Sequence, residues 1–137
     1  MEDRDEEVTY RFYTKTDNVL RDVLDERQRQ YEKWGEQNHK NGTGPGQLNR
    51  LAQTDLIDVF SGPPSAKMVP CCSAEHGKRL CDAATNNGKL TWGHILFEEV
   101  CEAFEESDPV KLRAELVQVA AVAVAWIEAI DRARSVK

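Results

Sequence analysis

The stretch AELVQVAAVAVAWI, residues 114–127, decides the fold. Twelve of its fourteen residues are apolar, and the two exceptions are Glu115 and Gln118. Wound into a helix, the apolar residues cover every face, so the sequence predicts a helix that lies inside a bundle. An ionised carboxylate in a dry interior is costly unless it is paired, protonated or bound to a cation. Glu115 is therefore the first residue around which we expect a functional site.

A second acidic segment, FEEVCEAFEE at residues 97–106, precedes this stretch. On a helix its glutamates share one face, and no lysine or arginine stands three or four residues away to relieve their repulsion. A plain solvated face is the simpler interpretation. However, the short Ser-Asp-Pro connection predicts that the two helices are antiparallel neighbours, which brings Glu115 within reach of Glu98, Glu99 and Glu102. Carboxylates that face one another in this way favour a hard divalent cation, Mg²⁺ or Mn²⁺.

The remaining pattern is also helical. Asp17 is the expected N-cap of a first helix that ends at Trp34, before Gly35, and its apolar stripe is formed by Leu20, Val23, Leu24, Tyr31 and Trp34. We expect a second helix over residues 73–84. A third, over residues 92–106, has Thr91 as its N-cap, and a fourth runs over 110–132. No strand is predicted, so the fold class is all-α.

Two segments lack this periodicity. Residues 1–15 are charged and unpatterned, which predicts a flexible N-terminal arm ahead of one helical domain over residues 16–137. Residues 38–72 contain many glycines and prolines and are expected to form a long irregular loop or insert between the first and second helices, with a weak signal for a short helix at 51–60.

Composition narrows the function classes. A net charge of −6 argues against binding to nucleic acid, which needs a basic surface. The longest unbroken apolar run, residues 119–127, is far shorter than the roughly 20 residues that span a bilayer, and no leader is visible, so we expect a cytoplasmic protein with no membrane role.

The cysteines suggest a zinc site only weakly. Cys71, Cys72, His76 and Cys81 lie close together, but adjacent cysteines seldom bind one ion and the usual CxxC pair is missing. Cys101 is expected to pack in the core.

The glutamates also support a family resemblance. Glu98-Glu99-Val100-Cys101-Glu102 followed by Glu115-Leu116-Val117-Gln118 resembles the EExxE…ExxD signature of the MazG-like nucleoside triphosphate pyrophosphohydrolases. The blocks TWGHILFEEVCEAFEE, RAELVQVAAVAVAWIEAIDR and ERQRQYEKWGEQNH extend the likeness over more than half of the chain. The resemblance implies a MazG-like four-helix bundle that forms a homodimer or a dimer of dimers.

The resemblance further implies Mg²⁺-dependent hydrolysis of a nucleoside triphosphate, with a deoxynucleotide as one option, to the monophosphate and pyrophosphate; Mn²⁺ is an alternative ion. The implied metal ligands are Glu98, Glu99, Glu102, Glu115 and Gln118, with Glu98 or Glu99 as the general base. The family has Asp where this chain has Gln118. An amide oxygen can bind a divalent ion but adds no charge, so this position weakens the expected metal affinity or orients Glu115 instead.

The block around residues 30–39 supplies the expected substrate contacts. Trp34 either closes the apolar stripe of its helix or stacks on a nucleobase. The other candidates are polar: Gln30, Gln37 and His39 for the base edge, and Lys33, with Lys78 or Arg79, for phosphate. His94 is expected to be a surface residue outside the catalytic set.

Two other functions remain open at this point. One is a catalytically weak or inactive MazG-like protein that binds a nucleotide as a sensor. The other is a structural helical module whose acidic face contacts a basic partner.

Overall fold

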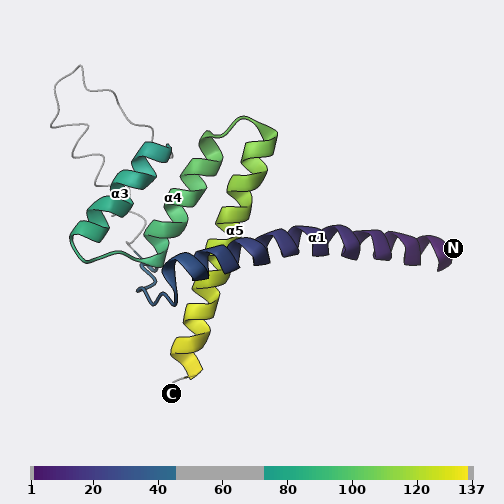
Figure 1. The fold of residues 1–137 in the computed structure, drawn as a ribbon, viewed down its shortest axis with the longest axis horizontal. Coiled ribbons are helices and arrows are strands. Elements are labelled where there is room, and N and C mark those ends of the chain that lie inside the picture. Colours follow the sequence, from purple (N-terminus) through teal and green to yellow (C-terminus); the bar gives the residue numbers. More distant parts are fainter. Residues whose placement is uncertain (1, 46–72, 136–137) are drawn as a thin grey trace.

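In the computed structural model, which describes residues 2–45 and 73–135, the chain is entirely helical in its regular structure. The helices are α1 (Glu2–Trp34), α3 (Ala74–Asn86), α4 (Trp92–Glu105) and α5 (Pro109–Ser135). α3, α4 and α5 lie side by side, and α1 crosses α5 and projects away from the other helices (Figure 1). The all-α prediction is confirmed. Cys71, Cys72 and the short helix predicted at 51–60 lie outside the described residues.

The ends of the helices follow the local sequence. Thr91 is the N-cap of α4, as predicted, and Asn87 is the C-cap of α3. Gly35 and Gly88 adopt positive φ just after α1 and α3, which ends each helix in the conformation that glycine tolerates best. None of the helices in the described ranges has the length and apolarity required to span a membrane.

The start of α1 differs from the prediction. One continuous helix begins at Glu2, so Asp17 lies inside α1 and is not its N-cap. Residues 2–15 therefore belong to a regular helix, where the sequence pattern predicted a flexible arm, and this part of α1 projects beyond the other helices (Figure 1). The helix can begin this early because residues 2–16 contain no proline or glycine that would interrupt it.

The main core lies between α4 and α5. Trp92 is almost fully buried and stacks on Trp126 with ring centroids 6.5 Å apart. Ala125 and Ala129 share this core with Val122, and their small side chains leave room for the two indoles. This packing fixes α4 against α5 and so fixes the relative positions of their glutamates.

α3 approaches α4 closely because of a glycine. A Cβ on Gly77 would lie 2.9 Å from the Cα of Glu98 and 3.2 Å from the Cβ of Cys101, so only glycine fits without a shift. Cys101 is fully buried at this contact, which confirms its predicted core position.

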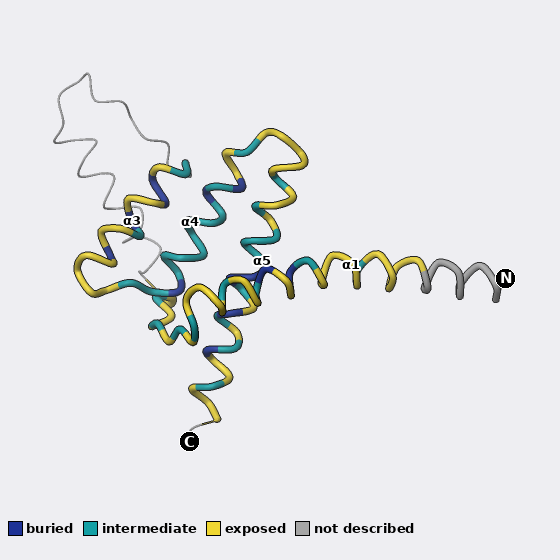
Figure 2. Tube along the Cα trace, in the orientation of Figure 1, coloured by how far each residue is buried: buried dark blue, intermediate teal, exposed yellow. Residues whose placement is uncertain are grey.

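α1 packs against α5 near the carboxyl end of α1. Ion pairs join Asp22 to Arg113 (2.6 Å) and Arg27 to Glu128 (3.0 Å). Between these anchors Val23 and Glu26 are buried. Figure 2 shows that the rest of the described α1 is largely exposed.

Two predictions of burial were wrong. Of the apolar stripe predicted for the first helix, only Val23 is buried, because α5 covers one short segment of α1. The four other members of that stripe, Leu20, Leu24, Tyr31 and Trp34, are each more than half exposed. α5 also exposes one face, including Leu116 and Ile127, so its apolar stretch is not enclosed on all sides within a single chain.

Candidate metal and active site

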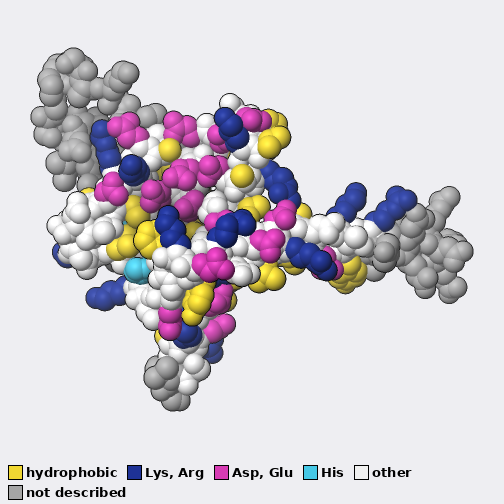
Figure 3. Space-filling model, in the orientation of Figure 1, with side chains coloured by type: hydrophobic (Ala, Val, Ile, Leu, Met, Phe, Trp, Pro, Cys, Tyr) yellow, Lys and Arg dark blue, Asp and Glu magenta, His cyan; other side chains and the backbone are white. Residues whose placement is uncertain are grey.

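A compact cluster of carboxylates lies where α4 faces α5. Glu99 and Glu102 come from α4 and Glu115 from α5, and one oxygen from each lies within 4.8 Å of the other two. All three side chains are half-buried. Within the described residues, this cluster has the spacing that a cation bound by several oxygens requires. Figure 3 shows acidic side chains gathered over α4 and along its border with α5.

The position of each glutamate follows from the helix period. Glu99 and Glu102 are three residues apart and so lie on the same side of α4, one turn from each other. Glu115 is in the second turn of α5, soon after the short connection that reverses the chain at Ser107-Asp108. The sequence prediction that Glu115 lies close to the α4 glutamates is what the geometry shows.

Glu98 belongs to the neighbouring side of α4, which faces α3. Its carboxylate accepts a hydrogen bond from the thiol of Cys81, and it lies close enough to Glu99 and Glu102 to act on both electrostatically. Burial, followed by the hydrogen bond to Glu98, raises the pKa of Cys81 to about 12. The thiol therefore stays protonated and serves as a donor to Glu98, which lies just outside the cluster of three.

The cluster destabilises its own negative charge. Burial is the largest cause that raises the pKa of Glu99 to about 7, and the charges of Glu102, Glu98 and Glu115 add to it. Burial and the charge of Glu115 likewise raise the pKa of Glu102. A site of this kind favours either protons or a cation, because both relieve the repulsion.

One further carboxylate near this cluster, that of Glu26, was not predicted from the sequence. Glu26 of α1 is buried, is paired with Arg29 at 2.7 Å, and is among the charges that act on Glu99. Its position in line with Val23 and Gln30, at helical spacing, was the signal available in the sequence. The cluster thus receives negative charge from three helices.

Two glutamates of the predicted acidic face have structural roles instead. Glu105 accepts a hydrogen bond from the backbone N–H of Ala74 at the start of α3. Glu106 accepts one from the backbone N–H of Asp108 in the turn before α5. Gln118 is half-buried one turn beyond Glu115 on α5.

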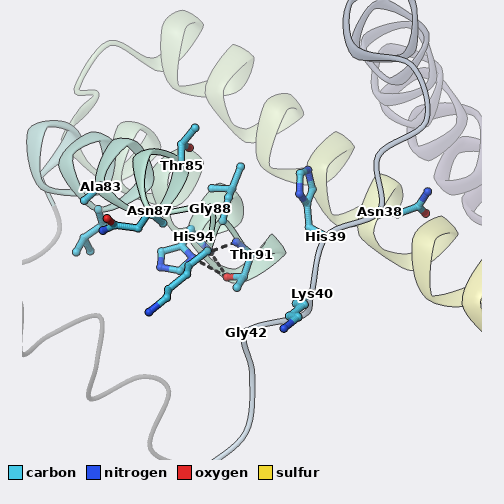
Figure 4. Close-up of a pocket in the computed structure, with 14 residues that line it drawn as sticks. Asn38, His39, Lys40, Gly42, Ala83, Thr85, Asn87, Gly88, Thr91 and His94 are labelled. Carbon is cyan, nitrogen blue, oxygen red and sulfur yellow. Dashed lines mark hydrogen bonds between the residues drawn. The ribbon is translucent and has the colours of Figure 1, made fainter.

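A separate cavity of about 730 Å³ lies at the opposite end of α4 from Glu105. It is lined by the 38–42 segment, the carboxyl end of α3 and the first turn of α4, with His39, Lys40, Lys89 and His94 among its residues (Figure 4). His39 packs edge-on against Trp92 with centroids 5.1 Å apart. Burial lowers the pKa of both His39 and His94.

The first turn of α4 is already capped inside this cavity. The backbone N–H groups of Trp92 and Gly93 donate to the carbonyl oxygens of Lys40 (2.9 Å) and Asn41 (3.0 Å). Thr91 and His94 complete a capping box in which Nδ1 of His94 accepts from the backbone N–H of Thr91. The helix end therefore has few free donors for an anion, and His94 is a capping residue, not the simple surface residue that was expected.

The other predicted substrate residues are dispersed. Trp34 is 59% exposed, so its core-packing interpretation was wrong, and the ammonium of Lys33 lies over its ring at 4.7 Å. The backbone carbonyl of Gln37 accepts from Arg132, and Gln30 is half-buried on α1. Lys78 is exposed on α3, where its neighbour Arg79 pairs with Glu75. Of the predicted substrate set, His39 lines the 730 Å³ cavity, and the other members do not: Gln30, Lys33, Trp34, Gln37 and Lys78.

The weakly suggested zinc site gains no support from the two of its four residues that the structure describes, Cys81 and His76. Cys81 is a donor to Glu98, and His76 is fully buried and packs edge-on against Phe97.

No family model, curated protein or solved structure matches the chain.

The raised pKa of Glu99 gives a testable pH dependence. Because the folded pKa (about 7) exceeds the ordinary value (4.5), the folded state holds a proton that the unfolded state has released between these pH values. Stability from this group is therefore full below about 4.5 and is lost as pH rises through 7. In metal-free buffer, Glu99→Gln is expected to raise the melting temperature more at pH 8 than at pH 5.

The control is Glu32→Gln on the exposed face of α1, which should show no such pH-dependent gain. A gain for Glu99→Gln that is equal at both pH values would contradict the assignment of the raised pKa to this carboxyl group.

Proposed function

We propose that this protein is a MazG-like pyrophosphohydrolase, which hydrolyses a nucleoside triphosphate to the monophosphate and pyrophosphate with Mg²⁺ as its cofactor. The observation that supports the proposal most directly is the half-buried cluster of Glu99, Glu102 and Glu115. These glutamates come from the two helices that carry the two halves of the motif, α4 and α5. Mn²⁺ is the alternative ion, because it accepts the same oxygen ligands.

The donor set fits a hard cation. Three carboxylate oxygens lie within 4.8 Å of one another, and all three cluster members are glutamates. The raised pKa of Glu99 and of Glu102 shows that their negative charges are unfavourable without a bound cation. When bound, Mg²⁺ supplies charge neutralisation of the phosphates and lowers the pKa of water next to it.

Different residues of this chain are assigned to metal binding and to proton transfer. Glu99, Glu102 and Glu115 would hold the ion, with Gln118 as a neutral ligand or a hydrogen-bond partner that orients Glu115. Glu98 lies beside the three but outside their cluster, so we assign to it, and not to the three ligands, the acceptance of a proton from the water that attacks the α-phosphorus. Glu99 is the alternative base, since the two adjoin on α4.

His39 is retained as a base-contacting residue because it lines a cavity of about 730 Å³, a volume that suits a ligand of nucleotide size. The other proposed substrate contacts rest on the sequence, from the chemistry of their side chains: Gln30, Lys33, Trp34, Gln37 and Lys78. A homodimer or a dimer of dimers and a cytoplasmic location are likewise proposed from the sequence.

The test is pyrophosphate release from a panel of ribonucleoside and deoxyribonucleoside triphosphates with and without Mg²⁺. We expect Mg²⁺-dependent release of pyrophosphate and monophosphate in equal amounts from at least one nucleotide. Nucleotide binding that needs Mg²⁺ but gives no turnover would overturn the enzymatic proposal and favour the sensor function, for which Gln118 in place of the family Asp is the specific argument.

A further inference from the structure

A buried glutamate holds Arg29 of α1 beside the carboxylate cluster. The Nε and Nη2 atoms of Arg29 each lie 2.7 Å from one oxygen of Glu26. Glu26 is buried and is one of the charges that act on Glu99. The side chain of Arg29 is nevertheless 63% exposed, so its positive charge stays open to a ligand next to the acidic cluster.

The helix period directs Arg29 toward the end of α5 that carries Glu115. Arg29 is seven residues after Asp22, so the two side chains leave α1 in directions only about 20° apart. Asp22 pairs at 2.6 Å with Arg113, which is two residues before Glu115 on α5. Arg27, by contrast, points about 160° away from Arg29 and pairs with the carboxyl-terminal half of α5.

The segment that follows α1 shows that this end of the helix lies near α4. The carbonyl oxygens of Lys40 and Asn41 accept hydrogen bonds from the first turn of α4. α1 crosses α5 and ends on the side of α5 on which α4 lies (Figure 1). Arg29 therefore belongs to the part of α1 between its contact with α5 and its connection to α4, and these are the two helices that carry the cluster.

The ion pair with Glu26 uses only one edge of the Arg29 guanidinium. Nε and Nη2 form that edge, and Glu26 does not contact the edge formed by Nη1 and Nη2. Two parallel N–H donors on a planar group match two oxygens of a phosphate. Glu26 also holds the guanidinium away from the cluster carboxylates, which therefore stay available to a metal ion.

A triphosphate at this site needs more positive charge than one metal ion supplies. Three ionised glutamates carry more negative charge than a single Mg²⁺ ion neutralises, and the phosphates add to it. Two of the cations predicted to contact phosphate are engaged elsewhere, because Lys33 lies over the ring of Trp34 and Arg79 is paired within α3. Arg29 has the required charge, and its partner Glu26 is among the charges that act on the cluster.

We propose that Arg29 binds the triphosphate of the substrate, with its guanidinium in bidentate contact with a phosphate while Glu26 holds it in position. This inference rests on the proposed function, because it names the side chain that contacts the phosphates at the same carboxylate site. The recognised group is a polyphosphate, so inorganic tripolyphosphate carries it without a base or a sugar.

The first test is calorimetric titration of the full chain with inorganic tripolyphosphate in excess Mg²⁺. We expect the wild type to bind and Arg29→Gln to raise the dissociation constant by about 10- to 100-fold, as for the loss of hydrogen bonds to a charged group. The dissociation constant for Mg²⁺ alone should change far less. The matched control is Arg21→Gln, at an exposed arginine two turns earlier on α1, which should keep the wild-type affinity for tripolyphosphate.

The double variant Glu26→Gln/Arg29→Gln separates direct contact from an indirect effect. Arg29→Gln alone leaves the buried Glu26 carboxylate unpaired, which adds negative charge near the phosphates and destabilises the fold. The double variant replaces the ion pair with two neutral side chains and leaves no unpaired charge. Tripolyphosphate binding that stays weak in the double variant supports direct contact, whereas a return to wild-type affinity, or a wild type that does not bind tripolyphosphate, would overturn it.

Pyrophosphate release distinguishes this inference from the proposed hydrolysis. If the wild type turns over a nucleotide and Arg29→Gln leaves its KM unchanged, the role of Arg29 is wrong and the hydrolysis stands. If tripolyphosphate binding requires Arg29 but no nucleotide of the panel releases pyrophosphate, the hydrolysis is wrong and the role of Arg29 stands.

Discussion

Replacing Glu115 with glutamine is expected to reduce pyrophosphate release by about 100-fold or more, since even the loss of an outer partner of a metal ligand costs about 10- to 100-fold. The same change should leave the melting temperature of the metal-free protein equal to or above that of the wild type. Glutamine keeps the size of the side chain but removes one of the charges that repel Glu99 and Glu102. Loss of activity together with unchanged or higher stability identifies a functional carboxylate.

The matched control for this experiment is Asp131→Asn, which removes a charge from an exposed position on the same helix. It should change neither the rate nor the melting temperature appreciably. If Glu115→Gln retained wild-type turnover, the cluster on α4 and α5 would not be the site of the reaction.

Addition of Mg²⁺ or Mn²⁺ is expected to raise the melting temperature of the wild-type protein by roughly 10 °C when the free ion is at about 100 times its dissociation constant. Binding to the folded state alone at that excess contributes about 2.7 kcal/mol, and each kcal/mol shifts the midpoint of a chain of this size by about 4 °C. The effect should shrink at pH 5, because protons compete with the cation for Glu99 and Glu102.

This experiment also separates the enzyme from a purely structural module. Glu115→Gln and Glu102→Gln should each lose most of the metal-induced shift, whereas Glu106→Gln, whose carboxylate binds a backbone N–H in the turn, should keep it. A melting temperature that millimolar Mg²⁺ leaves unchanged would favour the structural module.

The carboxylate cluster was the part of the site most accessible from sequence. The spacing of Glu99 and Glu102 places them on one side of α4. The Ser-Asp-Pro turn is so short that α5 must run back antiparallel beside α4. Glu115 stood out because the residues around it are apolar. These are local constraints of helix period and loop length, which a sequence displays directly.

The substrate residues were harder to predict for the opposite reason. Trp34 looked equally suited to a core and to a ligand, and its exposure depends on how far α5 extends along α1. The roles of His39 and His94 depend on the 38–42 segment, which returns to cap α4 through backbone carbonyls. Contacts between segments about fifty residues apart leave no periodic signal in the sequence.

The sequence by itself determined that the chain is helical, where most of its helices end, and which glutamates share a helix face, because these properties depend on neighbours within one or two turns. The tertiary structure decided which apolar faces are covered and that Glu26 approaches the cluster from α1. It also decided that Val23 of α1 is buried whereas Leu20 and Leu24 stay exposed. Those outcomes depend on the crossing of α1 over α5, and hydrophobicity fixes only that a face needs a partner, without specifying which surface provides it.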